Sequence, residues 1–199
     1  MAQIEMLYAP RKRESPARRR IRMLSLPFEL AFGAAAVLTV ILLATILVLA
    51  TGTETPYLRI DEAGAYITFN AVSSAPAGSI PVSDLALATR LAGAVVVATL
   101  YGSLAAAFVS LCRLFGHYRR GEVFARGAVG LMRQAGVWLI VFALVPAVSQ
   151  PLMRSLGSPD RAWFHSVSIV ALLVGGALFI LALITQLGRE IEHEGEGYI

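Results

Sequence analysis

Cysteine and histidine, the side chains that most often bind transition metals, are few and widely separated in this chain. They are one cysteine, Cys112, and three histidines, His117, His165 and His193. No two of the histidines have the spacing of metal or haem ligands, and Cys112 lies in an apolar run where inert packing is expected. No glycine-rich phosphate loop is present either. We therefore expect no metal, no cofactor, no small-molecule substrate and no catalytic site, and hence a protein that is not an enzyme.

One cluster of charged residues interrupts the apolar sequence, in the stretch HYRRGEVFARGAV at 117–129. It contains Arg119, Arg120, Glu122 and Arg126. Arginines beside a membrane span act as topology signals, and their guanidinium groups also bind carboxylates and phosphates through paired hydrogen bonds. Two interpretations stay open: a signal that only fixes orientation, and a surface that docks a partner.

The composition is typical of a membrane protein. Of the 199 residues, 57% are hydrophobic and 15% are charged, and the mean hydropathy is +0.69, whereas soluble domains have about 25% charged residues. The net charge of +4 also fits a nucleic-acid-binding protein, but the basic residues lie in blocks beside the apolar runs, as orientation in a bilayer requires. We therefore expect the lipid bilayer as a partner and no direct contact with nucleic acid.

Four apolar stretches are long enough to cross a bilayer, which takes about 20 residues of helix. The first is too long for the core of a signal peptide, and no convincing cleavage site follows it, so we expect it to be retained. The predicted fold class is all-α, a four-span transmembrane helical bundle. The predicted spans are 30–50, 91–114, 131–152 and 167–187.

The basic residues lie mainly on one side of the predicted spans. They precede the first span and occupy the loop 115–127, whereas the opposite side holds only Arg59, Arg90, Arg154 and Arg161. By the positive-inside rule, both termini and this loop face the cytoplasm of a bacterial cell, and the chain is a multi-pass inner-membrane protein. The predicted organisation is a basic N-terminal segment 1–27, a transmembrane domain 28–199, an extracytoplasmic loop 51–89 and an acidic cytoplasmic tail 188–199.

The outer segment is expected to contain a small β-hairpin. Residues 57–60 and 65–70 are β-prone, and the stretch from Asp61 to Gly64 between them has the composition of a turn. The sequence SSAPAGSIPVSD that follows is typical of a flexible linker. Ser83 is the expected N-cap of the helix that contains the second span.

Ionisable residues inside a span would indicate an ion path, and only Glu29 and Arg133 come close to this position. Both lie near the cytoplasmic ends of their spans, where they can reach the interface or pair with each other. Pro146 is a single kink candidate, with Ser149 and Gln150 beyond it. It lacks the counterpart that the repeated halves of a transporter would supply, so transport is the less favoured function.

Small residues recur at every fourth position of the second span and form a stripe on one helix face. Such stripes let helix backbones approach closely in lipid. The stripe packs either within this chain or against a partner chain; in both cases Gly102→Leu should destabilise, and replacing Val96, on another face, should matter less. Gly175 with Ala171 makes a shorter version in the fourth span. The stripe consists of Ala94, Ala98, Gly102 and Ala106.

The loop and the helix after it resemble a known family. In YRRGEVFARGAVGLMRQAG the resemblance rests on Gly121, Phe124, Leu131, Arg133 and Gly136. From the second span to its end, the chain resembles the bacterial four-span family catalogued as domain of unknown function 2975, whereas the basic N-terminus and the outer segment depart from it. The resemblance implies no catalytic residues. Because some members are encoded beside small helix-turn-helix regulators, it also implies a cytosolic regulator as a partner.

The same residues have a physical interpretation. Gly121 permits a sharp turn at the membrane surface, and Phe124 can insert its ring there. Arg126 and Arg133 share a helix face if the helix begins early, where they meet lipid phosphates or the acidic tail. We therefore expect a non-enzymatic interaction or regulatory protein, whose partner is a cytosolic regulator or another membrane protein; the alternatives are an accessory subunit of a membrane complex and, less favoured, a small transporter. The candidate docking residues are Arg119, Arg120, Gly121, Phe124, Arg126 and Arg133.

Overall fold

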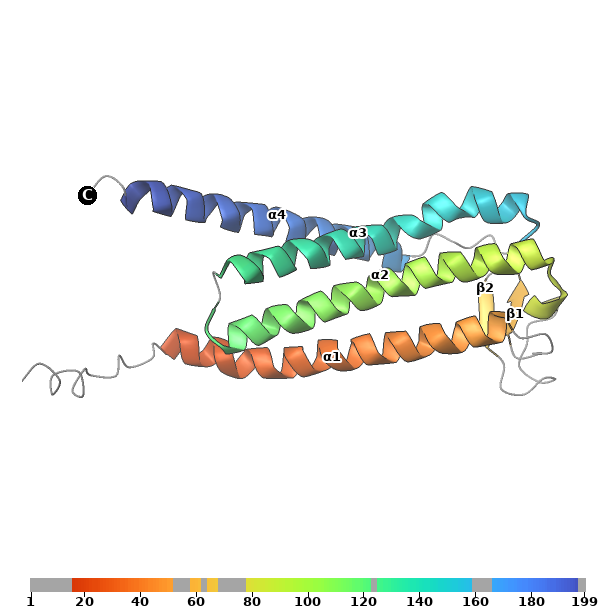
Figure 1. The fold of residues 1–199 in the computed structure, drawn as a ribbon, viewed down its shortest axis with the longest axis horizontal. Helices are drawn as coiled ribbons and strands as arrows, with labels where there is room; N and C mark the ends of the chain where they lie inside the picture. Colours follow the sequence, from red (N-terminus) through yellow and green to blue (C-terminus); the bar gives the residue numbers. More distant parts are fainter. Residues whose placement is uncertain are drawn as a thin grey trace, which may run out of the picture.

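Four long helices of alternating direction make up most of the molecule. They are α1 (Pro16–Thr51), α2 (Leu87–Arg119), α3 (Arg126–Ser155) and α4 (Ser166–Glu196). The start of α1, the α2–α3 connection and the end of α4 lie at one end of the molecule, which we call the loop end, and a small sheet lies at the opposite, sheet end (Figure 1). This computed structural model describes residues 16–51, 58–61, 64–67, 78–122, 125–158 and 166–196.

All four helices are long and apolar enough to cross a membrane, which confirms the predicted all-α, four-span fold. Many large apolar side chains point outward, among them Leu38, Val148 and Leu173. An apolar surface of this extent is typical of contact with lipid rather than water. The chain is therefore an integral membrane protein. Its apolar segments are Ile21–Ala50, Leu87–Arg119, Gly127–Ser155 and Val167–Gly188.

Each helix packs along its neighbour in the sequence, α1 against α2, α2 against α3 and α3 against α4. Within the described ranges, no other pair of helices packs closely along its length. The helices therefore form an open row with α1 and α4 at its edges, and α4 extends beyond the first turn of α3 at the loop end (Figure 1).

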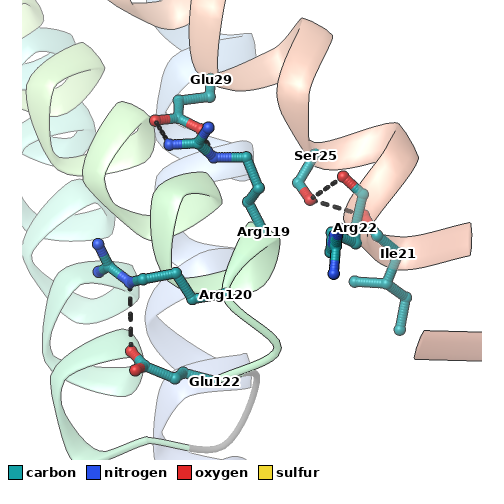
Figure 2. A network of polar contacts seen from close by, with 7 residues as sticks. All are labelled: Ile21, Arg22, Ser25, Glu29, Arg119, Arg120 and Glu122. Atoms are coloured by element: carbon teal, nitrogen blue, oxygen red, sulfur yellow. Dashed lines mark hydrogen bonds and ion pairs between the residues drawn. The ribbon is translucent and has the colours of Figure 1, made fainter. Parts of the chain in front are cut away.

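The first helix begins inside the predicted basic segment 1–27, because α1 starts at Pro16 and continues through Pro27. A proline within a helix has no N–H to donate to the preceding turn. In the same turn the hydroxyl of Ser25 donates to the carbonyl of Ile21 at 2.6 Å (Figure 2). From Pro16 onward, the basic segment and the first span are one continuous helix.

At the sheet end, two strands form the predicted hairpin. β1 (Leu58–Asp61) pairs antiparallel with β2 (Gly64–Ile67), and Asp61 lies opposite Gly64. The pairing falls within the β-prone stretches on both sides of the expected turn. The hairpin prediction is therefore confirmed for these residues.

The prediction of a flexible linker after the hairpin is wrong for its last part. The chain forms β3 (Ile80–Pro81), which pairs with the free edge of β1, and then a 3-10 helix, η2 (Val82–Asp84). This part is ordered because Val82 is buried with apolar residues of α1 and β1, a contact between distant segments that the local composition does not reveal. The buried cluster consists of Ala50, Leu58, Ile60 and Val82.

The expected N-cap at Ser83 is also wrong. Ser83 lies in η2, where its hydroxyl donates to the carboxylate of Asp84 at 3.3 Å. The helix α2 begins only at Leu87, after Ala86 in the N-cap position. The turn of 3-10 helix that intervenes carries Ser83 away from the first N–H groups of α2.

The first turn of α2 ties the helices together at the sheet end. The guanidinium group of Arg90 donates two hydrogen bonds, of 3.1 and 2.9 Å, to the carbonyl of Ala50 near the end of α1. The hydroxyl of Thr89 donates to the carbonyl of Leu156 at the end of α3, at 2.6 Å. Carbonyls at helix ends have no partner within their own helix, so these contacts satisfy groups that would otherwise be exposed to the apolar phase.

The small-residue stripe of α2 does not provide a close approach within this chain at Gly102. Beyond the adjacent turns of α2 itself, no atom of the described residues lies within 4 Å of the position that a Cβ would take there. Val96, on another face of α2, is only 7% exposed, so this face is the packed one. The close approach occurs instead between Gly136 of α3 and Gly175 of α4.

Candidate functional site

The α2 helix ends in a Schellman motif at the loop end. The N–H of Glu122 donates to the carbonyl of His117, and the N–H of Gly121 donates to the carbonyl of Tyr118, both at 3.0 Å. Gly121 has a φ of +81°, the left-handed conformation that this motif requires and that glycine adopts without a steric penalty. The predicted sharp turn at Gly121 is confirmed.

A side-chain pair braces the same turn. Nδ1 of His117 lies 2.6 Å from a carboxylate oxygen of Glu122. Nε of Arg120 lies 3.6 Å from the same oxygen, and Figure 2 shows this second pair. The hydrogen bond with His117, and then the charge of Arg120, lower the pKa of the Glu122 carboxyl. In most Schellman motifs the two side chains at these positions make an apolar contact. Here the two residues are His117 and Glu122, and their contact is polar.

An ion pair joins α1 to the end of α2. Oε2 of Glu29 lies 2.9 Å from Nε of Arg119, and Nη2 of Arg119 donates to Oε1 of Glu29 at 3.4 Å (Figure 2). The carboxylate lies against Gly116, where a Cβ would come within 3.4 Å of Oε1. Of the two alternatives left open by the sequence, pairing of Glu29 with Arg133 is not the one found, because the carboxylate pairs with Arg119. Arg119 is nearer because α1 packs along α2 and not along α3.

Aromatic rings fill the α1–α2 interface beside this ion pair. Phe115 stacks on Phe28 and Phe32, with ring centroids 5.2 and 5.6 Å apart, and Tyr118 meets Phe115 edge-on at 5.7 Å. Stacked and edge-on pairs contribute about 0.5–1.5 kcal/mol each beyond the burial of their area. The end of α2 that carries the docking candidates is therefore held firmly against α1.

An open groove of about 990 Å³ lies at the loop end between α1, α2 and α3. Three arginines line it, together with polar side chains and one tryptophan. Among the described residues that line the groove, Glu29 is the only acidic one, and Arg119 neutralises its carboxylate. The side chains that carry the polar and aromatic character of this loop-end groove are Glu29, Arg113, His117, Arg120, Arg133, Gln134 and Trp138.

The predicted docking residues do not all lie together in the structure. Arg119 faces α1, and Arg120 and Gly121 lie in the turn. Arg133 lines the loop-end groove, as does the side chain of Arg120. Arg126 is the first residue of α3, but its side chain, like the whole of residue 124, lies outside the part that the structure describes.

Two participants were missed by reasoning from the sequence. Arg113, near the end of the second predicted span, lines the groove together with Arg133 of the neighbouring helix. The pairing of Glu29 with Arg119 was also missed, although both residues lie near the loop end of adjacent antiparallel spans. Matching the axial depth of the charges on consecutive spans would have found this pair.

The chemistry that this end of the molecule supports is recognition of anions. Guanidinium groups and a tryptophan N–H are hydrogen-bond donors without acceptor capacity. Among the residues searched, which are the described ones, no group of three or more metal-binding side chains occurs.

The fold and the site define a four-helix integral membrane protein with a basic groove at one end. No protein-family model matches the chain, and no curated protein and no solved structure matches it significantly.

Proposed function

We propose that this chain is a bacterial inner-membrane protein, with both termini and the loop end in the cytoplasm, that acts as a non-enzymatic interaction or regulatory protein. The observation that carries the proposal is the rigid turn at Gly121. A loop that only fixes orientation needs charge but no defined shape, whereas this turn is fixed by two backbone hydrogen bonds and the His117–Glu122 pair. A fixed turn that displays the exposed side chain of Arg120 is what a docking surface requires.

The partner proposed for this surface is a small cytosolic helix-turn-helix regulator or another membrane protein. The first follows from the resemblance to the family catalogued as domain of unknown function 2975. The second, in which the chain is an accessory subunit of a membrane complex, is favoured by the open space beside Gly102. A position on a small-residue helix face with open space beside it among the described residues suits contact with another transmembrane helix.

The orientation is tested with single cysteines at Ser15, Ser73 and Ser155 in a Cys112→Ser background. In intact cells, a membrane-impermeant thiol reagent should label the cysteines at 73 and 155 and leave the one at 15 unlabelled. The basis is the positive-inside rule. Labelling at 15 together with silence at 73 would reverse the orientation.

Docking is tested with a photoreactive amino acid in place of Arg120, and with a matched control in place of Arg154. Both arginines are exposed, but Arg154 lies in the last turn of α3 at the sheet end. The probe at 120 should give a discrete protein adduct that the probe at 154 does not, and Gly121→Val should remove it while insertion persists. Identical adducts at both positions would contradict the proposal.

A further inference from the structure

We propose that the loop-end groove binds the phosphate of an anionic membrane lipid between Arg113 of α2 and Arg133 of α3. The groove is open, holds about 990 Å³ and is lined by both guanidinium side chains. Basic pockets between transmembrane helices suit the headgroups of anionic lipids. This inference does not rest on the proposed protein partner, because it concerns Arg113 and Arg133 and not Arg120, the third arginine that lines the groove.

The two arginines lie at the right depth for lipid phosphates. Arg113 precedes the end of α2 at Arg119, and Arg133 follows the start of α3 at Arg126, by fewer than three turns in each case. At 1.5 Å per residue, both Cα atoms are about 10 Å from the nearby helix ends. Side chains at this depth extend toward the headgroup layer rather than into water beyond it.

The charges of these two arginines are not balanced within the described part of the protein. Glu29 is paired with Arg119, and Glu122 faces His117 and Arg120. Neither Arg113 nor Arg133 makes an ion pair or a hydrogen bond through its side chain with any described residue. An uncompensated pair of guanidinium groups in a partly apolar groove attracts an anion, and phosphate accepts their paired donors well.

The apolar part of the groove lining argues for a lipid rather than a free phosphate. Leu131, Val137 and Trp138 line the groove alongside the arginines, and Val137 is exposed. Trp138 lies deeper than Arg133 along α3 and offers an apolar ring with one N–H donor, a combination suited to the membrane interface. A ligand that fits both the arginines and this apolar lining carries an anionic head and an apolar chain.

The test compares the binding of phosphatidylglycerol and of phosphatidylcholine to the purified full-length protein in neutral detergent, followed by native mass spectrometry. The wild-type protein should prefer phosphatidylglycerol. The double variant Arg113→Gln/Arg133→Gln should lose about tenfold in affinity for it, because each basic side chain near the headgroups contributes to the attraction. The matched control Arg154→Gln, on the same helix at the sheet end, should bind as the wild type does.

Three further measurements distinguish a lipid in the groove from a soluble phosphate or the acidic tail. Arg113→Lys/Arg133→Lys keeps the charges, so it should bind more phosphatidylglycerol than the glutamine variant, and size-exclusion chromatography checks that both are folded. If glycerol 3-phosphate binds as tightly as the lipid, the ligand is a soluble phosphate. If Glu190→Gln/Glu192→Gln/Glu194→Gln raises lipid binding tenfold, the acidic tail is the occupant. Either result, or equal binding of the two lipids by the wild type, would overturn the proposal.

Discussion

Gly136 and Gly175 face each other where α3 crosses α4, and neither position has room for a side chain. A Cβ at Gly136 would lie 2.7 Å from the carbonyl oxygen of Gly175, and a Cβ at Gly175 would lie 2.9 Å from the carbonyl oxygen of Gly136. Backbone contact of this kind is how transmembrane helices gain packing energy, since lipid tails are as apolar as the side chains they would replace. This pair of glycines holds the edge helix α4 against the rest of the molecule.

Gly136→Ala should therefore destabilise the protein, by about 1–3 kcal/mol as for an overpacked core. The matched control is Gly102→Ala in α2, where a Cβ would have no neighbour within 4 Å. This control should leave the protein as stable as the wild type, or slightly more stable because alanine favours the helix. Unfolding curves in mixed detergent measure both variants. Equal destabilisation at 136 and 102 would contradict the assignment of the crossing point.

The pair of Glu29 and Arg119 should show coupling in a double-mutant cycle. Arg119 is about half exposed and Glu29 is 22% exposed, so solvent screens the interaction, and the expected coupling energy is about 0.5–1 kcal/mol. Glu29→Gln, Arg119→Gln and the double variant are compared by their free energies of unfolding. A parallel cycle of Glu29 with Arg133 should give no coupling. A larger coupling energy in this second cycle would contradict the assignment of Arg119 as the partner of Glu29.

Replacement of Gly121 should destabilise the end of α2. Because its φ is +81°, Gly121→Ala places a Cβ in the left-handed region, at a cost of about 1–2 kcal/mol. Gly130→Ala serves as the control, because Gly130 is inside α3 with no atom within 4 Å of a Cβ. Thermal unfolding should show a lower midpoint for the first variant only. If Gly121→Ala leaves the midpoint of thermal unfolding unchanged, the Schellman turn does not contribute to the stability of the protein.

Acid should loosen the same turn through Glu122. Its pKa is lowered from 4.5 by the hydrogen bond with His117 and by Arg120. The stabilisation from a carboxyl with a lowered pKa is complete above the unfolded value of 4.5 and is lost as the pH falls below it through the folded value. Hydrogen exchange at the amides of Gly121 and Glu122 should therefore accelerate in the wild type as the pH falls below 4.5, after correction for the intrinsic rate. Glu122→Gln should show no such transition.

The number of spans, the approximate extent of each and the basic character of the loop end were determined by the sequence alone. Hydropathy and charge are local properties of the chain, and a bilayer selects about 20 apolar residues wherever they occur. The turn at Gly121 was predictable for a similar reason, because glycine is the residue that adopts a positive φ without strain. The hairpin of β1 and β2 likewise follows from β-prone residues around a turn.

Contacts between elements were decided only by the tertiary structure. The partner of Glu29, the order of β3 and the glycines at the tightest crossing depend on how each helix is rotated and offset along its neighbour. In a soluble protein, the apolar face of each helix would indicate that rotation. In lipid the outward face is as apolar as the packed one, so the sequence of α2 does not distinguish the open side at Gly102 from the buried side at Val96.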